Sequence, residues 1–503
     1  MAGGLMQLVA YGAQDVYLTA NPQITFWKVT YRRHTNFAME AIEQTFNGQA
    51  DFGRRVTCTV SRNGDLAYRT YLEVTLPAIK TGNANHARWL DYPGEQLINE
   101  VEVEIGGQVI DRQYGQWMHI WNQLTMTKEQ EPGYLKMVGH TTALTYLTDP
   151  KYYTNPGACD DGELNVCSPL NELPETTLYV PLQFWFNRNP GLALPLIALQ
   201  YHEVKININL SPLDRMCWAS DDLSKHERKT LSGISLSNAS LFVDYIFLDT
   251  DERRRMAQNP HEYLIEQLQF TGEESVGSSS NKIRLNFNHP CKQLVWTVQR
   301  DSFVDECDSE TINKVYGCQY FNYTDGLDVL PKALRAFSAV PASGTGDIVG
   351  TGVGGSGFPA LEAYGTGAEN GEVMPETVAY IASQNALTMH CWGDNPVVTA
   401  KLQLNGQDRF SEREGSYFDV VQPYQHHTRH PDTGINVYSF ALRPEEHQPS
   451  GTCNFSRIDN ATLHLLLSHA TVSQNETAKV RVYAVNYNVF RCISGMGGLA
   501  YSN

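Results

Sequence analysis

Short stretches of alternating apolar and polar residues recur along the 503-residue chain, separated by turns rich in Gly, Pro, Asn and Asp. Such alternation predicts β-strands with one buried face, and it occurs at residues 26–31, 37–46, 55–61, 70–76, 199–210 and 282–288. Further strands are expected at 178–187, 239–249, 293–298, 437–442, 461–467 and 478–490. A helix is expected around 118–127, and residues 250–263 are expected to form a short helix or a linker.

One hairpin pattern occurs twice. Residues 102–117 (EVEIGGQVIDRQYGQW) and 401–417 (KLQLNGQDRFSEREGSY) each run from an alternating stretch into Gly-Gln, then Asp-Arg, then a second glycine before an aromatic residue. Gly106-Gly107 and Asn405-Gly406 are dipeptides that tolerate the positive φ angles of a two-residue turn. A hairpin that returns 299 residues later, from Gln at 108 to Gln at 407, predicts a duplicated β-domain.

Other turns support the duplication. Asn63-Gly64 predicts a hairpin turn between the strands at 55–61 and 70–76. The turn with Pro190-Gly191 has a counterpart in the one with Pro449 and Gly451, and the strands that follow each turn come in the same order. Paired elements lie 299, 260 and about 240 residues apart, so that only the loops differ in length.

The expected fold is therefore all-β, with two consecutive eight-stranded jelly-roll domains, a double jelly roll, that carry long loops and a few short helices. The expected division is an N-terminal arm at 1–25, a first jelly roll at 26–250, a linker at 251–263, a second jelly roll at 264–490 and a C-terminal tail at 491–503.

Composition argues against several classes of function. The formal net charge is −17, and an acidic surface repels phosphate backbones, so direct binding of nucleic acid is not expected. The ten cysteines contain no C-x-x-C pair, which argues against a zinc ribbon. Free thiols are favoured over bridges between Cys159 and Cys167 or between Cys307 and Cys318. The N-terminus lacks the features of a signal peptide.

Several residue clusters that could carry chemistry have simpler interpretations. His426-His427-x-x-His430 lies between prolines and predicts an exposed loop rather than a metal site. The Gly-rich stretch 344–371 lacks the G-K-[ST] ending of a phosphate-binding loop. The adjacent acids Glu273-Glu274 and Glu445-Glu446 point to opposite faces of a strand, which does not suit a glycosidase pair. Ser450 lacks the nucleophile-elbow motif, and no cofactor is expected.

Two further groups concern the surface. Among the N-x-[ST] sequons, Asn322 and Asn475 are glycosylation candidates because they fall in predicted loops, and Asn238 is a third. Arg253-Arg254-Arg255 predicts a solvated linker, with an intersubunit or lipid contact as the alternative.

Longer motifs add a resemblance. The chain resembles the major capsid proteins of large icosahedral double-stranded DNA viruses, and most closely those of algal viruses of the chlorella type. The motifs that carry it are spread over nearly the whole chain and include NPQITFWKVTYRRHTNF (21–37), EIGGQVID (104–111), NPGLALPLIALQYHEVK (189–205), FVDYIFLDTDERRRMAQNPHEYLIEQLQFTG (242–272) and QPSGTCNFSRIDNATL (448–463).

The resemblance implies a structural function and no enzymatic activity. It implies a homotrimer whose six jelly rolls form a pseudo-hexagonal capsomer, and capsomers that tile the outer shell of a virion assembled in the host cytoplasm. Implied partners are neighbouring capsomers, penton and minor capsid proteins, and an underlying membrane reached through other proteins. The alternative is a carbohydrate-binding or carbohydrate-cleaving β-sandwich, which requires a concave patch of aromatic and carboxylate side chains.

Overall fold

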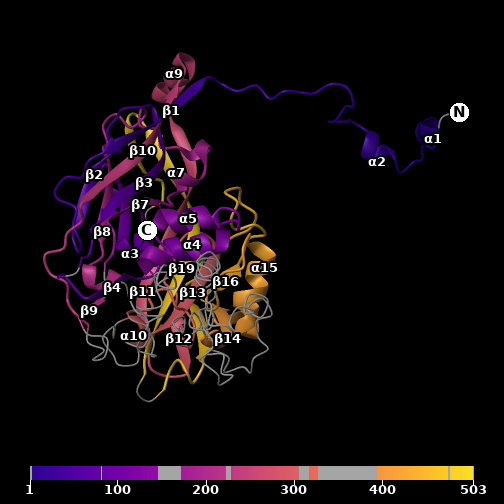
Figure 1. Cartoon of the computed structure of the whole chain (residues 1–503). Helices are drawn as coiled ribbons and strands as arrows, with labels where there is room; N and C mark the ends of the chain where they lie inside the picture. Colours follow the sequence, from indigo (N-terminus) through magenta and orange to yellow (C-terminus); the bar gives the residue numbers. More distant parts are fainter. Residues whose placement is uncertain are drawn as a thin grey trace, which may run out of the picture.

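The computed structural model describes residues 3–80, 82–145, 172–221, 228–304, 317–326, 393–473 and 476–501. These residues form two jelly rolls that lie against each other, with an N-terminal arm that extends away from both (Figure 1).

The first roll consists of two four-stranded antiparallel sheets. One sheet has the order β1 (Phe37–Gln44), β10 (Asn238–Leu248), β3 (Leu66–Leu76) and β7 (Thr176–Pro181). The other has the order β2 (Arg55–Thr59), β8 (Val204–Leu210), β5 (Ile98–Ile105) and β6 (Gln108–Tyr114). A small sheet pairs β4 (His86–Trp89) with β9 (Cys217–Ser220).

The second roll repeats this arrangement. One sheet has the order β11 (His261–Val276), β19 (Ala478–Ile493), β13 (Pro290–Arg300) and β16 (Asn436–Ser439). The other has the order β12 (Ser280–Arg284), β18 (Ala461–Leu467), β14 (Val397–Leu404) and β15 (Gln407–Glu414). Two short strands, β17 (Cys453–Asn454) and β20 (Met496–Leu499), pair with β13 and β19.

The strand order shows the duplication directly. The short strands β4, β9, β17 and β20 are left out of the count, and the other eight strands of each roll are numbered along the chain. The first sheet then joins strands one, eight, three and six, and the second joins strands two, seven, four and five. Both rolls follow this order, which is that of an eight-stranded jelly roll. The predicted fold class is therefore confirmed.

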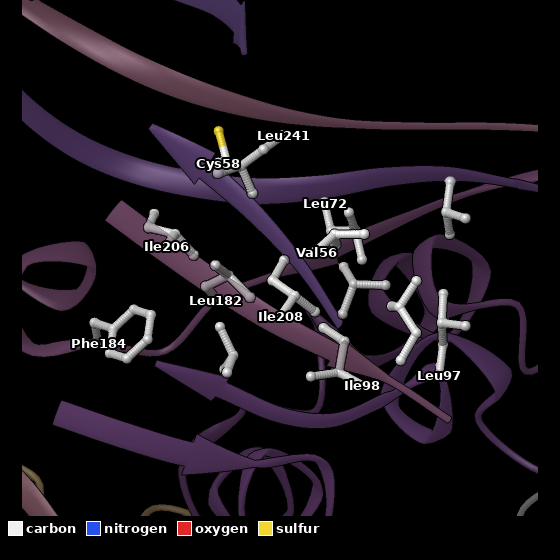
Figure 2. Packing of buried hydrophobic residues seen from close by; sticks show 14 of the residues in the cluster. Val56, Cys58, Leu72, Leu97, Ile98, Leu182, Phe184, Ile206, Ile208 and Leu241 are labelled. Atoms are coloured by element: carbon white, nitrogen blue, oxygen red, sulfur yellow. The ribbon is translucent and has the colours of Figure 1, made fainter. Parts of the chain in front are cut away.

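Alternating side chains from the two sheets of the first roll meet in one core. On β3, Leu72, Val74 and Leu76 are fully buried and are separated by partly exposed residues. All three belong to one hydrophobic cluster with side chains of the facing sheet. Figure 2 shows Leu72 of this cluster together with Val56 and Ile206. Each buried aliphatic side chain contributes about 1.5–3 kcal/mol relative to exposure. The second roll has a separate core, built in the same way.

The two repeated hairpins form as predicted, between β5 and β6 and between β14 and β15. Their turn residues have positive φ angles, +60° and +86° at Gly106 and Gly107 and +52° and +82° at Asn405 and Gly406. Such turns match the twist of the strands that they join. Each hairpin also has a bulge at the same place, beside Val103 in the first roll and beside Leu402 in the second.

The hairpin expected at Asn63-Gly64 is wrong. Strand β2 pairs with β8, whereas β3 pairs with β10 and β7, so this segment carries the chain from one sheet to the other. A small residue is required for a different reason, because a Cβ atom at Gly64 would lie 2.8 Å from Cβ of Tyr245.

The remaining turns lie in connections. Pro190 and Gly191 form a 3₁₀ turn, in which the Gly191 N–H donates to Oδ1 of Asn189 at 2.9 Å. Pro449 and Gly451 lie in the loop after β16, where Gly451 has a φ of +146° and a Cβ atom would crowd the carbonyl oxygen of Phe440.

Helices occur mainly in the connections between strands. The predicted helix around 118–127 is α4, and the expected helix or linker at 250–263 includes α9. The described helices are α1 (Gly3–Val9), α2 (Val16–Thr19), α3 (Pro93–Leu97), α4 (Gly115–Thr125), α5 (Glu131–Val138), α6 (Thr142–Thr145), α7 (Trp185–Arg188), α8 (Leu213–Met216), α9 (Thr250–Gln258), α10 (Asp301–Val304) and α15 (Gln422–His426), with the 3₁₀ turns η4 (Pro190–Leu192) and η8 (Phe455–Arg457) and the π-helical turn η7 (Tyr417–Val421).

Several expected strands differ from the structure. Those expected at 199–210, 282–288 and 437–442 are shorter and correspond to β8, β12 and β16. Residues 26–31 form no strand and belong to the exposed arm, where no described strand pairs with them. The strand expected at 178–187 ends with β7 at Pro181, and α7 begins at Trp185.

Candidate assembly interface

Helix α4 joins the two rolls. It follows strand β6 of the first roll, and its ten residues from Gly115 to Leu124 are all buried. The ring centroids of Trp117 and Tyr483 lie 5.3 Å apart, so that α4 reaches β19 of the second roll. Its side chains Trp117, Ile120, Trp121 and Leu124 share one hydrophobic cluster with Val295, Val437, Tyr483 and Val485 on the sheet β11-β19-β13-β16.

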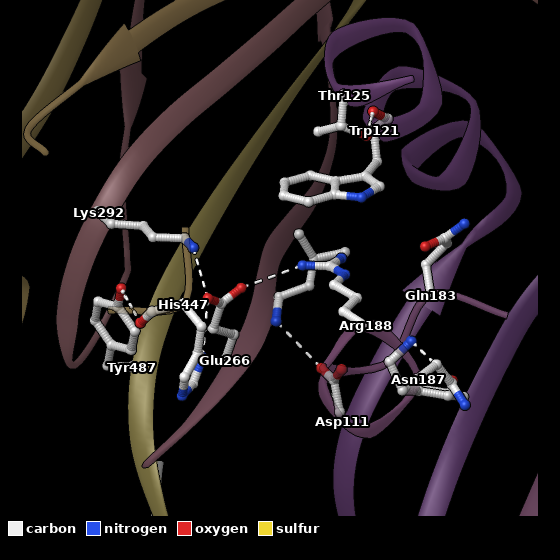
Figure 3. Close-up of polar contacts among 12 residues, drawn as sticks. Asp111, Trp121, Thr125, Gln183, Asn187, Arg188, Glu266, Lys292, His447 and Tyr487 are labelled. Carbon is white, nitrogen blue, oxygen red and sulfur yellow. Dashed lines mark hydrogen bonds and ion pairs between the residues drawn. The ribbon is translucent and has the colours of Figure 1, made fainter. Parts of the chain in front are cut away.

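A buried group of charges lies beside this helix (Figure 3). Glu266 on β11 pairs with Arg188 of the first roll at 3.2 Å and with Lys292 on β13 at 2.7 Å. Nδ1 of His447 lies 3.3 Å from the same carboxylate. The Arg188 guanidinium also lies 3.9 Å from the ring centroid of Trp121 on α4. Glu266 therefore holds groups from both rolls, and we call these contacts and the α4 cluster the inter-roll interface.

The electrostatics at this interface depend on burial. Burial on its own would raise the pKa of Glu266, but the hydrogen bond with His447 and the charges of Lys292 and Arg188 outweigh it and lower the pKa to about 2. Burial lowers the pKa of Lys292. By contrast, burial raises the pKa of Asp111 on β6 to about 7, although its Oδ1 accepts the Leu268 N–H at 3.1 Å.

A crevice of about 470 Å³ opens between β6 and β11. It has the aromatic and carboxylate side chains that the carbohydrate-binding alternative requires, among them Tyr114, Phe270 and Asp111. Asp111, however, is buried, and its oxygens accept hydrogen bonds from the Leu268 N–H and from Nε2 of Gln113. This carboxylate therefore holds the two rolls together, and the crevice does not favour sugar chemistry.

The N-terminal arm is the most exposed part of the described chain. Helices α1 and α2 bury no residue, and the arm extends into solvent as far as β1 (Figure 1). Exposed apolar clusters of this kind mark interaction surfaces. The large exposed apolar side chains of the arm are Leu5, Met6, Leu8, Val9, Tyr11, Val16, Tyr17, Leu18, Ile24, Phe26, Trp27, Val29 and Tyr31.

The glycosylation candidates have different surroundings. Asn322 is only 3% exposed, and its Nδ2 donates to Oε1 of Gln319 at 2.6 Å and to the Gly326 carbonyl at 2.9 Å. The expectation of an accessible loop is therefore wrong for Asn322, because a glycan needs that nitrogen. Asn238 is exposed at the first residue of β10. Asn475 lies outside the described residues.

The histidine cluster differs from the expected exposed loop. His426 ends α15, and the buried ring of His427 places Nδ1 at 2.9 Å from Oε1 of Glu445. The same carboxylate accepts the Thr428 N–H at 2.8 Å, so that one member of the Glu445-Glu446 pair has a structural role. In the part of the chain that the structure describes, no group of three or more His, Cys, Asp or Glu is placed to hold a metal ion.

Two other sequence expectations also concern structural contacts. Arg253 is not merely solvated, since its Nε lies 2.8 Å from Oδ1 of the buried Asp65 and so fixes α9 to the first roll, while Arg254 and Arg255 are exposed. Cys318 is disulfide-bonded, which corrects the expectation of free thiols for this residue. The free thiols among the described cysteines are Cys58, Cys217, Cys291, Cys453 and Cys492.

Comparison with known proteins decides the family. A family model described as the N-terminus of a major capsid protein matches residues 25–249, and one described as large eukaryotic DNA virus major capsid protein matches residues 252–498. The chain belongs to the major capsid proteins of large eukaryotic DNA viruses. Its function is structural, as part of the capsid shell of a virion.

Individual relatives agree over their full length. The chain is 68% identical to the major capsid protein of Phaeocystis pouchetii virus and 42% identical to that of Paramecium bursaria Chlorella virus 1, in each case over 100% of both chains. A solved PBCV-1 virus capsid is similar with a TM-score of 0.64 and 36% identity, covering 95% of this chain and 100% of that one. No helix among the described residues has the length and apolar character to cross a membrane.

Proposed function

We propose that this capsid protein forms a homotrimer in which six jelly rolls surround one axis as a pseudo-hexagonal capsomer. The observation that carries the proposal is the identical strand order of the two rolls. Closed rings of identical chains use head-to-tail contacts, in which one surface of a chain meets a different surface of the next. A chain with two similar jelly rolls therefore gives six similar jelly rolls in a ring of three chains.

The contact between the rolls within one chain supports this arrangement. There the outer face of one sheet of the second roll is covered by α4 of the first roll. A similar contact between the second roll of one chain and the first roll of the next would continue the ring and close it after three chains.

We also propose the wider assembly. The net charge of −17 supports a shell that does not touch the genome. Neighbouring capsomers, penton and minor capsid proteins, and an inner membrane reached through those proteins are the proposed partners, with assembly in the host cytoplasm. The expected domains at 26–250 and 264–490, with the arm at 1–25, the linker at 251–263 and the tail at 491–503, are proposed with three boundaries moved. The arm is extended to residue 36, the second roll begins at residue 261 with β11, and it ends at residue 499 with β20. Asn238 and Asn475 are the proposed glycan acceptors.

Size-exclusion chromatography with light scattering tests the trimer. At micromolar concentration the purified chain should elute with three times its mass of 56.4 kDa. A stable monomer or dimer at that concentration would contradict the proposal.

A further inference from the structure

The helical segment after the second hairpin, Ser416–His426, is the counterpart of α4. Gly115 and Gly415 precede the two segments, and at each a Cβ atom would overlap a carbonyl oxygen of the roll's own strand, that of Ile98 or of Val397. Three residues further on, Met118 and Phe418 enter the cores of their own rolls. Both pairs of anchor residues are 300 apart in numbering, and we align the two segments on this difference, although residues 417–421 form a π-helical turn where α4 is α-helical.

The outward positions of the two segments differ in exposure. On α4 the four side chains that pack on the second roll are at most 6% exposed. Their counterparts are also apolar or aromatic, yet among the described residues they share no hydrophobic cluster with the first roll. Trp117, Ile120, Trp121 and Leu124 correspond to Tyr417, which is partly buried, and to Val420, Val421 and Tyr424, which are 46%, 37% and 84% exposed.

The surface that corresponds to the one under α4 is open as well. Helix α4 covers the outer face of sheet β11-β19-β13-β16, and the equivalent sheet of the first roll is β1-β10-β3-β7. Its outer face carries an aromatic cluster, in which the Tyr71 ring stacks on Phe242 at 5.2 Å and lies 6.2 Å from Tyr179. Tyr179 is 40% exposed, and Met39 on the edge strand β1 is 59% exposed.

Within one chain these two surfaces lie apart, with α15 on the second roll and the sheet on the first (Figure 1). We propose that the segment Ser416–His426 of one copy packs, through Tyr417, Val420, Val421 and Tyr424, on the outer face of sheet β1-β10-β3-β7 of the next copy. The inference rests on the proposed trimer and names the surfaces that close it. The contact is head-to-tail, like that of α4 within the chain.

Both surfaces carry charged side chains beside their aromatic residues. Asp244 and Glu73 lie close enough to Tyr71 to raise its pKa, together with burial. On the other surface the Arg413 guanidinium lies 4.6 Å from the ring centroid of Tyr417. Exposed Arg69 also lies two residues from Tyr71 on β3, and Glu412 and Glu414 flank Arg413 on β15. Each surface therefore carries both signs of charge, and the proposed contact rests on its apolar and aromatic side chains.

A mixing experiment tests the contact with full-length chains. One variant, Val420→Ser with Tyr424→Ser, damages the helical segment, and another, Tyr71→Ser with Tyr179→Ser, damages the sheet face. Each variant alone should run as a folded monomer in light scattering, at a micromolar concentration at which the unmodified chain is a trimer. The concentration at which the trimer dissociates should therefore rise about tenfold or more. Mixed in equal amounts they should form a dimer, because one intact helical segment then meets one intact sheet face.

Controls separate this inference from the trimer itself. Val398→Ser with Tyr201→Ser changes side chains that are 44% and 76% exposed elsewhere, and this variant should stay trimeric. Val420→Lys, at a position already exposed in the single chain, is a second helix-side variant and should also be monomeric. A trimeric sheet variant, a trimeric Val420→Lys variant, or a mixture that stays monomeric would overturn the contact, whereas a monomeric unmodified chain would overturn the trimer.

Discussion

Glycine is required at two kinds of position in this fold, the hairpin turns and the starts of the two helical segments. The positive φ angles of Gly106, Gly107 and Gly406 follow from the hairpin pattern. The sequence does not show why glycine is required at positions 115 and 415. At each position a carbonyl oxygen leaves no room for a Cβ atom, and this oxygen belongs to a strand that begins 17 or 18 residues earlier. Likewise, the sequence does not show that Asn322 is buried. Its Nδ2 bonds to the nearby Gln319 and Gly326, and the loop that they form is held against β13, where Nε2 of Gln299 donates to the Asn322 carbonyl at 3.2 Å.

Replacing Gly415 by Ala should destabilise the second roll. Its Cβ atom would overlap the carbonyl oxygen of Val397, and overpacking of this kind costs about 1–3 kcal/mol. The thermal unfolding temperature should fall by several degrees in calorimetry. Gly133→Ala in α5 is the control, because a Cβ atom there meets nothing within 4 Å. Equal unfolding temperatures for the two variants would contradict the role given to Gly415.

Glu266→Gln should weaken the inter-roll interface in a pH-dependent way. The change leaves Lys292 and Arg188 buried without their counter-charge, which costs about 3–5 kcal/mol at neutral pH. Because the folded pKa of Glu266 is lowered from 4.5 to about 2, its contribution is present above pH 4.5 and is lost as the pH falls toward 2. The stability difference between the two proteins should therefore shrink at low pH.

Urea unfolding at pH 7 and pH 3, followed by tryptophan fluorescence, measures this difference, since Trp121 stacks on Arg188. Glu262→Gln on the same strand is the matched control, because the Glu262 side chain is 58% exposed. Its effect should be small at both pH values. A Glu266→Gln effect of the same size at pH 7 and pH 3 would contradict the charge network.

At the scale of elements, strands with clear alternation were predicted and those with polar interiors were missed. The alternation of apolar and polar residues does not reveal β11, whose buried positions include Glu266 and Gln267. These polar groups are satisfied by Lys292, Arg188 and the Ile110 carbonyl, partners that the sequence does not reveal. Conversely, residues 26–31 alternate but have no strand to pair with. Periodicity predicts a buried face, while pairing depends on the fold.

Removing the arm residues 1–25 should leave both rolls folded and weaken assembly beyond the single capsomer. Within this stretch α1 and α2 bury no residue, so the unfolding temperature should stay unchanged. Sedimentation velocity should show fewer assemblies larger than the capsomer. The variant Leu8→Ser with Leu18→Ser keeps the length of the arm and removes two exposed apolar side chains. It should also weaken assembly beyond the capsomer. Loss of soluble folded protein on truncation would contradict the prediction.

At the scale of the whole molecule, the duplication was predictable because the hairpin and the order of strands are both repeated in the sequence. How the rolls pack was not predictable, since it depends on α4 reaching across to β13 and β19. That packing supports the proposed trimer, because the second roll has a corresponding helical segment whose side chains Val420, Val421 and Tyr424 are exposed.

The most direct test of the account is the symmetry of the purified oligomer. Class averages of stained or frozen particles, viewed down the axis, should show six lobes related by threefold symmetry, with two alternating lobe shapes from the two rolls. Averages with twofold symmetry, or with three lobes only, would contradict the claim that each chain supplies two adjacent jelly rolls of a pseudo-hexagonal capsomer.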